Sequence, residues 1–252
     1  MIINNKKDAA KFLGINENEI FYFCIFSNGD WAYEDKDEYY HLYRKINNKW
    51  TELTEKINIK YVSSYPNGDW EYQDEDGYWH LFRRINNKWT ELTKNVNATW
   101  VWSFVNKDWS YRDEKGCYHL FRKINSQWVE LTKNVKAKAT DIWSYDNGDW
   151  AYQDKERYRH LFRLINNEWV ELTEGINTTW IFSYDNGDWV HHNIGEYYHL
   201  FREINGEQIE LTKNVNAICI DSYDNSDWEY EDEDGYCYKF NKNNELIEKY
   251  KL

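Results

Sequence analysis

The chain of 252 residues carries 31 Lys or Arg and 44 Asp or Glu, which gives a formal net charge of -13 at pH 7. Binding to a phosphate backbone depends on Lys and Arg, so this charge opposes a nucleic-acid partner and permits a basic protein or a neutral glycan. No apolar run approaches the roughly 18 residues that a membrane helix needs, and we predict no membrane insertion.

Signals for export, disulfides and cofactors are lacking in the sequence. The first 14 residues, MIINNKKDAAKFLG, contain no apolar stretch like that of a secretory signal, which predicts a cytoplasmic protein, with non-classical export left open. The four cysteines have no Cys-x-x-Cys spacing, which favours buried free thiols over disulfides or a zinc site. We expect a monomer that holds no cofactor and no metal.

The first predicted element is a short helix. Residues Lys6–Leu13 fit a helix of about two turns, and Gly14 suits the left-handed conformation that ends many helices. We expect residues 1–19 to form a capping segment and residues 20–252 to form a single β-repeat domain.

The rest of the chain repeats one sequence unit six times. Its most constant feature is an Asp-Trp pair, whose tryptophans are 39, 39, 41, 39 and 39 residues apart. The longer interval comes from two extra residues near 136–141. The predicted repeats span about 20–57, 58–96, 97–135, 136–176, 177–215 and 216–252.

Each repeat has the pattern of four short strands. In the second repeat, Asn67-Gly68 predicts a two-residue hairpin turn with both residues at positive φ, and Asn86-Asn87 predicts the turn into the last strand. The strands expected in this repeat are Lys60–Tyr65, Asp69–Gln73, Tyr78–Asn86 and Lys88–Thr93.

The third of these strands carries large side chains on both faces, which indicates a sheet that is covered on both sides. Four-stranded units of about 39 residues that stack on one another are typical of a β-propeller. We therefore predict an all-β fold, a six-bladed β-propeller with a short N-terminal helical cap. The alternative is an open β-solenoid of stacked hairpins, in which the degenerate sixth repeat would be an atypical end.

Recurring Asp, His, Ser or Thr, and Trp in a unit of this length resemble the WD-repeat propellers. In that family these residue types form a hydrogen-bonded network within a blade. The resemblance gives such parts to Asp69, Trp70, His80, and Ser64 or Thr93. The order differs, since Asp directly precedes Trp and no Gly-His pair opens the repeat. The stretch NGDWEYQDEDG also resembles the core of bacterial WG repeats, with Glu where that family has Gly after Trp.

The Asp-Trp pairs and a recurring Arg are the candidate ligand-binding residues. An indole can stack on the apolar face of a sugar, while a carboxylate accepts hydrogen bonds from its hydroxyls and an Arg donates to them. The alternative is structural, with Asp bridging the amides of the hairpin and Trp packing between blades. The candidates are Asp30, Trp31, Asp69, Trp70, Asp108, Trp109, Asp149, Trp150, Asp188, Trp189, Asp227, Trp228, Arg44, Arg83, Arg122, Arg163 and Arg202.

Two other patterns suggest metals but do not fit them. One His recurs in the third strand of five repeats, and one His per blade is too dispersed for metal bonds of about 2 Å. Acidic turns such as Asp74–Gly77 are too short for a calcium loop, and several carry Lys. We expect these turns to be solvated.

These patterns predict a non-enzymatic binding or scaffold protein that engages a protein partner through the rims of the propeller. The negative charge favours a basic partner. The alternative is a multivalent lectin with one Asp-Trp site per repeat. The sequence contains no Gly-rich phosphate loop and no nucleophile elbow, so we expect no enzymatic activity.

Overall fold

A computed structural model describes residues 2–55, 57–135, 138–192 and 197–251 of the chain. The chain divides into two compact units, Met1–Lys133 and Asn134–Leu252, which we call unit 1 and unit 2. The predicted single β-repeat domain and its repeat boundaries stay predictions. No helix within the described ranges is long and apolar enough to cross a membrane.

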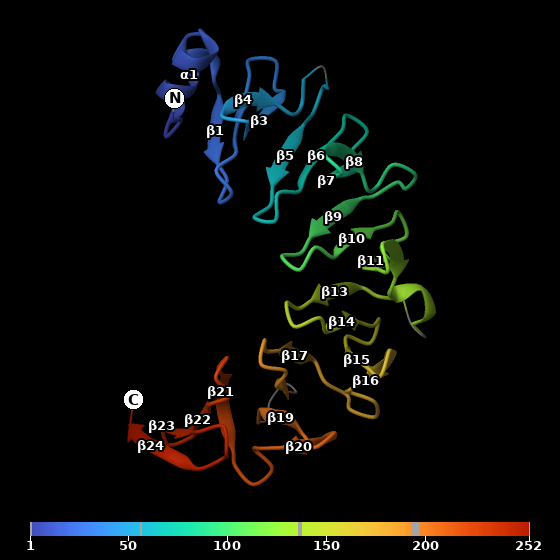
Figure 1. Cartoon of the computed structure of the whole chain (residues 1–252), viewed down its shortest axis with the longest axis vertical. Coiled ribbons are helices and arrows are strands. Elements are labelled where there is room, and N and C mark those ends of the chain that lie inside the picture. Colours follow the sequence, from blue (N-terminus) through green and yellow to red (C-terminus); the bar gives the residue numbers. More distant parts are fainter. Residues whose placement is uncertain (1, 56, 136–137, 193–196, 252) are drawn as a thin grey trace. The chain divides into compact units, whose positions relative to one another are not determined.

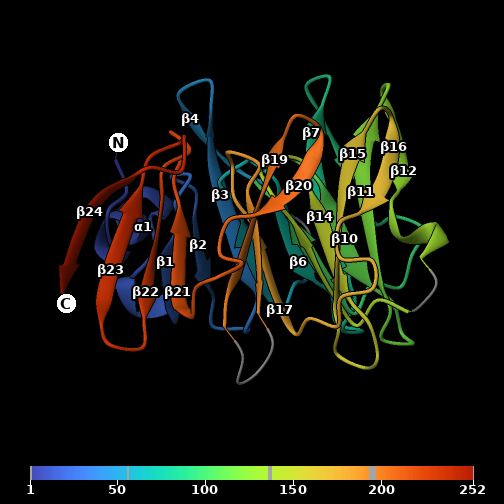
Figure 2. The ribbon, with the colours of Figure 1, turned by 90° about the horizontal axis from the view of Figure 1, so that it is seen from below.

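The regular structure consists mainly of short strands (Figures 1 and 2). Unit 1 contains α1 (Lys6–Leu13), a 3-10 helix (Glu17–Glu19), β1 (Tyr22–Ile25), β2 (Trp31–Glu34), β3 (Tyr40–Ile46), β4 (Lys49–Glu52), β5 (Tyr61–Ser64), β6 (Trp70–Gln73), β7 (Trp79–Ile85), β8 (Lys88–Glu91), β9 (Trp100–Ser103), β10 (Trp109–Arg112), β11 (Tyr118–Ile124) and β12 (Gln127–Glu130). A second 3-10 helix (Thr132–Asn134) spans the boundary. Unit 2 contains β13 (Asp141–Ser144), β14 (Trp150–Gln153), β15 (Arg159–Ile165), β16 (Glu168–Glu171), β17 (Trp180–Ser183), β18 (Trp189–His192), β19 (His199–Ile204), β20 (Glu207–Glu210), β21 (Ala217–Ser222), β22 (Trp228–Asp232), β23 (Tyr236–Phe240) and β24 (Leu246–Lys251).

The strands of the described residues form six four-stranded sheets, three in each unit. In every sheet, four consecutive strands pair antiparallel in chain order, and we call these sheets blades 1 to 6. A four-stranded antiparallel meander is the unit from which propellers are built. The predicted all-β fold of six four-stranded blades with a short N-terminal helix is confirmed.

The strands of the second repeat agree with the prediction to within two residues at each end. Asn86-Asn87 has φ values of 49° and 62°, as the predicted two-residue turn requires. The prediction for the first hairpin was wrong in one respect, because Gly68 has a φ of 89° but Asn67 has no positive φ. Backbone hydrogen bonds join Tyr65 to Asp69 and Gly68 to Tyr65, so the loop has one residue more than predicted. A type I turn followed by a left-handed glycine fits such a loop.

Helix α1 forms at the predicted residues and covers one face of blade 1. The Asn5 side chain accepts a backbone hydrogen bond at its start, and Gly14 ends it with a φ of 72°. Ala9 and Ala10 are buried and pack in one core cluster with Trp31. The small alanines let the helix backbone approach the indole closely, so α1 is a cap on this face.

The hydrophobic core lies between successive blades. The Asp-Trp indole of one blade packs on a leucine from the third strand of the blade before it, and both side chains are buried. The pairs within the two units are Trp70 with Leu42, Trp109 with Leu81, Trp189 with Leu161, and Trp228 with Leu200. In blades 1, 2, 4 and 5 the leucine face therefore contacts the following blade, and in blades 2, 3, 5 and 6 the tryptophan face contacts the preceding one.

Candidate functional site

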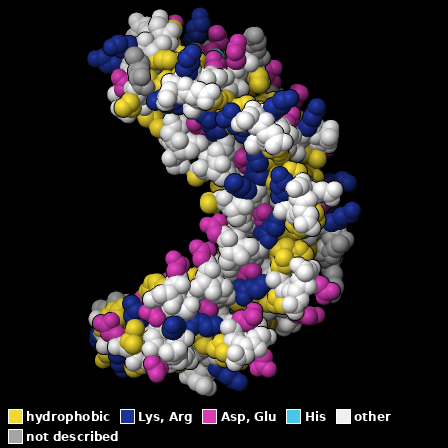
Figure 3. Space-filling model, in the orientation of Figure 1, with side chains coloured by type: hydrophobic (Ala, Val, Ile, Leu, Met, Phe, Trp, Pro, Cys, Tyr) yellow, Lys and Arg dark blue, Asp and Glu magenta, His cyan; other side chains and the backbone are white. Residues whose placement is uncertain are grey.

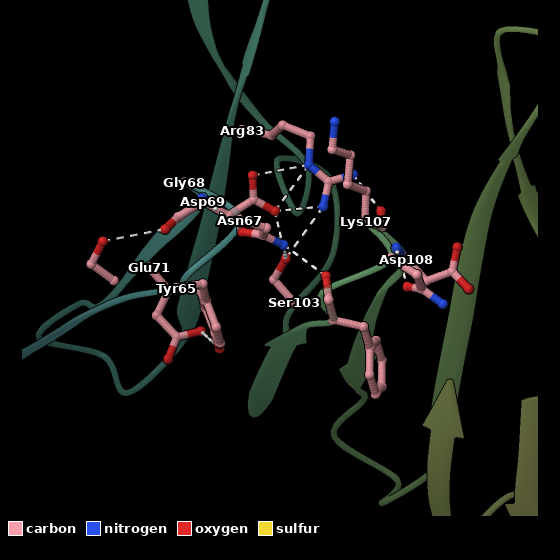
Figure 4. Close-up of polar contacts among 12 residues, drawn as sticks. Tyr65, Asn67, Gly68, Asp69, Glu71, Arg83, Ser103, Lys107 and Asp108 are labelled. Atoms are coloured by element: carbon pink, nitrogen blue, oxygen red, sulfur yellow. Dashed lines mark hydrogen bonds and ion pairs between the residues drawn. The ribbon is translucent and has the colours of Figure 1, made fainter. Parts of the chain in front are cut away.

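Two of the predicted site residues, Asp69 and Arg83, form a buried ion pair within blade 2 (Figure 4). Arg83 donates from Nε to the two carboxylate oxygens of Asp69 at 3.0 and 2.9 Å, and from Nη2 to Oδ2 at 2.5 Å. Asp69 is 2% exposed and Arg83 is 9% exposed. This forked geometry leaves little of either charge to a ligand from solvent.

The same pair reaches blade 3. Ser103 donates its hydroxyl to Asp69 at 2.5 Å, and Arg83 donates from Nη1 to the carbonyl oxygen of Lys107 at 2.5 Å. Asn67, in the hairpin turn of blade 2, donates to Ser103 Oγ at 2.7 Å and to a backbone carbonyl beside it. This arrangement, which we call the clasp, joins one blade to the next through Asp, Arg, Asn and Ser.

The clasp recurs between the other successive blades inside each unit. Its ion pair and its serine from the following blade are Asp30, Arg44 and Ser64; Asp149, Arg163 and Ser183; and Asp188, Arg202 and Ser222. Asp108 and Arg122 form the same ion pair within blade 3. In blade 6, Asp227 is half-buried, Asn241 stands in the place of the arginine, and Lys242 N–H donates to the carboxylate.

The six predicted tryptophans are buried. Trp31, Trp70, Trp109, Trp150, Trp189 and Trp228 are between 0% and 4% exposed. A sugar needs an open indole face for stacking, but each of these indoles stacks on a ring from the third strand of its own blade, with 4.4 to 4.5 Å between centroids. The prediction that the Asp-Trp pairs bind a ligand stays untested, while their contacts are those of the structural alternative. The structural alternative expected the Asp side chain to accept a backbone amide of the hairpin. The acceptor is instead the Asn67 side chain, whose Oδ1 lies 2.9 Å from Asp69 N.

The recurring histidines belong to a second network, on the other side of the blade. His80 Nδ1 lies 2.8 Å from Glu91 Oε1, and its Nε2 lies 3.0 Å from Asp74 Oδ2. The ring stacks on Tyr72 with 4.6 Å between centroids. Since Asp69 and His80 lie in different networks, the single network that the WD-repeat resemblance implies is not formed.

The two further residues of that implied network also have other partners. Ser64 donates to Asp30 of the preceding blade at 2.6 Å. The Thr93 hydroxyl oxygen accepts the backbone N–H of Leu81 at 3.0 Å, which continues the pairing of the third strand beyond β8. Both side chains act in holding strands and blades together.

The pKa of His80 is set by opposing effects. Burial lowers it, but hydrogen bonds to Asp74 and Glu91 and their negative charges raise it by more, so the net pKa lies above 6.5. The same balance raises the pKa of His41 beside Glu52 and Asp35. These histidines are therefore held between two carboxylates in the way that favours their cationic form.

The acidic turns between the second and third strands are linked along one edge of each unit. In unit 1, the Tyr39 hydroxyl donates to Glu75 of the next turn at 3.1 Å, and Tyr78 donates to Glu114 at 2.7 Å. In unit 2, Tyr197 donates to Glu233 at 2.5 Å. The exposed carboxylates on this edge of unit 1 are Asp37, Glu38, Glu75, Asp76 and Glu114. We call this row the acidic edge.

An open pocket of about 200 Å³ lies on blade 6, lined by residues that include Cys219, Glu229, Cys237 and Tyr250. Cys219 is exposed, so the prediction of buried thiols is wrong for this residue. Burial of the thiol group, followed by the charges of nearby carboxylates, raises the pKa of Cys219. A raised pKa keeps the thiol protonated, whereas a nucleophile needs the thiolate. The described residues contain no group of three His, Cys, Asp or Glu that could hold a metal ion.

Sequence reasoning did not single out the exposed aromatic residues of the first strands. Tyr22 in β1, Tyr61 in β5 and Trp100 in β9 are 50%, 46% and 44% exposed. The signal was present in the sequence, because these residues take the same position of successive repeats, ahead of the hairpin turn. The exposed rings of unit 1 thus lie in the first strands, or at Phe21 directly before β1, and not in the Asp-Trp pairs.

Comparisons with known proteins give no family. No family model and no curated protein matches the chain. Among solved structures, YCF48 bound to D1 peptide is similar, with a TM-score of 0.38 and 9% sequence identity over 90% of this chain and 80% of that chain. A likeness at this level carries no argument about what the chain binds.

Proposed function

We propose that the chain is a non-enzymatic scaffold that binds a positively charged protein partner on the acidic edge of unit 1. The observation that carries the proposal is the link between successive acidic turns. Tyrosine hydroxyls hold Glu75 and Glu114 in place, so the carboxylates of three blades form one row. The turns also carry the exposed Lys36 and Lys115, but carboxylates outnumber them, and the net negative charge of the row complements a basic partner and speeds its association.

The lectin hypothesis is not carried forward, because it required open indole faces in the Asp-Trp pairs and these indoles are buried. The cytoplasmic location and the monomeric state stay predictions.

Pull-down from an extract of the native host at low and high salt tests the proposed function. The test variant combines Asp37→Asn, Glu38→Gln and Asp76→Asn, which removes exposed charge and keeps the carboxylates bound to His and Tyr. The control variant removes three exposed carboxylates from the hairpins between third and fourth strands, with Glu168→Gln, Glu203→Gln and Glu207→Gln.

We expect a partner that is retained at low salt and released at high salt, because salt screens exposed charges. The test variant should lose this partner, and the control variant should keep it. A partner that both variants retain equally, or the absence of any salt-sensitive partner, would contradict the proposed function.

A further inference from the structure

Three exposed rings of unit 1, Tyr22, Tyr61 and Trp100, belong to equivalent rows of three blades. In each row, a residue of the first strand pairs across the second strand with a residue of the third strand. The rows are Tyr22, Glu34 and Tyr40 in blade 1; Tyr61, Gln73 and Trp79 in blade 2; and Trp100, Arg112 and Tyr118 in blade 3. Each row is therefore aromatic at both ends and polar in the middle.

The rows join into one strip, because the last ring of a row contacts the first ring of the next. Ring centroids are 6.0 Å apart for Tyr22 and Tyr40, and 6.2 Å apart for Tyr40 and Tyr61. They are 5.2 Å apart for Tyr61 and Trp79, and 5.3 Å apart for Trp79 and Trp100. We call these five residues the aromatic strip. It runs across β1, β5 and β9, which lie on one side of unit 1 (Figure 1).

The strip is ridged, because exposed rings alternate with packed ones. Tyr22, Tyr61 and Trp100 are about half exposed, Tyr40 is half-buried, and Trp79 is 7% exposed. Neighbouring rings are tilted by 47° to 64° relative to one another. Figure 3 shows hydrophobic side chains on the same side of unit 1, interspersed with charged ones. Exposed aromatic surface of this extent in a folded unit is typical of a binding site.

Tilted rings indicate a peptide rather than a sugar as the occupant. A linear glycan stacks best on coplanar ring faces, whereas an extended, proline-containing peptide docks between the rings of an aromatic surface. Such a peptide already has an extended conformation before it binds, so ordering it costs little.

The charges beside the strip differ from blade to blade. The middle residue of the row is Glu34 in blade 1, Gln73 in blade 2 and Arg112 in blade 3. Glu34 adjoins the first turn of the acidic edge, and Arg112 is exposed. Complementary charges on a peptide would be positive over blade 1 and negative over blade 3.

We propose that the aromatic strip binds an extended, proline-containing peptide segment of the partner, with a Lys or Arg over blade 1 and an Asp or Glu over blade 3. The inference rests on the proposed function, since it names the segment of the protein partner that unit 1 recognises. Tyr22, Tyr61 and Trp100 supply apolar contact, and Glu34 and Arg112 set the direction of the peptide.

A phage-displayed library of random dodecapeptides, selected on the full chain, tests the inference. The test variant is Tyr61→Ala with Trp100→Ala, and the control variant is Phe182→Ala with Tyr223→Ala, two rings of unit 2 that are 41% and 38% exposed. The wild type and the control should enrich peptides that carry proline, with a basic residue toward one end and an acidic residue toward the other. Synthetic copies of those peptides should bind the test variant about tenfold or more weakly, as for truncated aromatic anchors.

A charge-reversed variant, Glu34→Lys with Arg112→Glu, tests the direction of the peptide. It should prefer synthetic peptides in which the basic and acidic residues have exchanged places. Unchanged preference would overturn the assigned direction, and unchanged affinity in the Tyr61→Ala, Trp100→Ala variant would overturn the strip as the site. Binding of a glycan array that the same variant abolishes, without peptide enrichment, would overturn the peptide in favour of sugar.

The two failures are distinguishable. If the acidic-edge variant loses the salt-sensitive partner while the strip variant keeps it, the proposed function stands and the aromatic strip is not its peptide site. If neither variant changes binding of any partner or peptide, both the proposed function and the inference fall.

Discussion

Blade 2 in unit 1 and blade 6 in unit 2 have the same strand order but carry different residues on the face that bears the leucine in the other blades. Blade 2 presents the buried Leu81 and the arginine of the clasp, whereas blade 6 has Lys239 and Asn241 at these positions. Both differences lie on the face that contacts the next blade in blades 1, 2, 4 and 5. Trp228, which packs on the preceding blade, is retained and is 2% exposed. The leucine and the arginine therefore change together, as expected of residues that serve the contact with the next blade.

Blade 1 differs from blade 2 on the opposite face, the one that carries the tryptophan. Its Trp31 packs against α1, which covers the indole. Phe12 of α1 packs edge-on against Trp31, with 6.0 Å between ring centroids. A tryptophan face is thus covered by a blade or by a helix, which is the reason that the indoles are unavailable for stacking on a ligand.

The largest expected effect comes from breaking the clasp in unit 1. Asp69→Asn leaves Arg83 as an uncompensated charge that is 9% exposed, and we expect a loss of about 3–5 kcal/mol in the free energy of unfolding. The matched change in unit 2, Asp227→Asn, affects a half-buried carboxylate without an arginine, and we expect about 1 kcal/mol or less. Urea denaturation followed by tryptophan fluorescence measures both.

Equal losses for the two variants would contradict the view that the clasp exists to hold a following blade. Hydrogen exchange should also show faster exchange in blades 2 and 3 for Asp69→Asn, because the clasp joins these two blades.

The second largest loss of unfolding free energy is expected from a substitution on the leucine face. Leu81→Ala removes a fully buried side chain that packs on Trp109, and the resulting cavity should cost about 2–5 kcal/mol. Lys239→Ala in blade 6 removes a cation that lies 5.3 Å from the ring centroid of Tyr223, which should cost about 1 kcal/mol at most. The same denaturation assay compares them, and a Lys239→Ala loss as large as that of Leu81→Ala would show that the outer face of blade 6 is packed like an interior one.

The histidine networks of blades 2 and 5 should respond to pH with opposite sign. In blade 2 the raised pKa of His80 stabilises the fold below about 6.5, and this contribution is lost as the pH rises through the folded-state pKa. In blade 5, burial and then the nearby His199 and His192 lower the pKa of His191 to about 4. Here stability is full above about 6.5 and is lost as the pH falls toward 4.

Replacing His191 by the tyrosine that all five other blades have at this position tests the second half of this prediction. His191→Tyr should remove the acid-dependent loss, which amounts to about 3 kcal/mol at most. His80→Gln should remove the loss at higher pH and leave the acid limb unchanged. Hydrogen exchange of peptides from β18–β19 and from β6–β7, recorded across this pH range, reports each blade separately, and the same slope in both blades would contradict the assignment.

The repeat itself made most of the fold predictable. The spacing of the Asp-Trp pairs and the turn residues place the strands of blade 2 within two residues, and Lys6–Leu13 forms the predicted helix. These features depend on local sequence, which a single chain displays. The prediction of a two-residue hairpin at Asn67-Gly68 was wrong because the Asn67 side chain accepts the Asp69 amide within a three-residue loop. The same loop forms in blade 6, where Asn225 accepts the Asp227 amide.

The partners of the candidate residues could not be predicted from the sequence, because they depend on contacts between repeats. Asp69 pairs with Arg83 of its own blade and with Ser103 of the next, so the candidate residues were found but their partners were not. Glu71 is 6% exposed and accepts a hydrogen bond from the Tyr65 hydroxyl at 2.5 Å, at a position where blade 1 has alanine. Whether such a side chain is buried depends on which face meets the neighbouring blade, and the alternating pattern of a short strand does not decide that.

The smallest expected effect concerns the indole N–H of the buried tryptophans. In blade 5, Trp189 Nε1 donates to Gln208 at 2.9 Å, whereas in blade 2 the Trp70 N–H finds no hydrogen-bond acceptor and the Trp89 ring stands edge-on, 6.0 Å between centroids. Gln208→Leu should cost about 1–2 kcal/mol, because it leaves a buried donor unpaired.

Gln208→Trp is the variant that distinguishes blade 5 from blades 1 to 4 at this position. It rebuilds the arrangement of blade 2, in which the Trp89 ring lies where an acceptor for the Trp70 N–H would be. A weak N–H to ring contact should then restore up to about 1 kcal/mol of the unfolding free energy lost in Gln208→Leu. Hydrogen exchange of the β18 amides compares the three proteins. If Gln208→Leu matches the wild type, the buried indole N–H needs no acceptor, and the arrangement in blades 1 to 4 is then explained by ring packing alone.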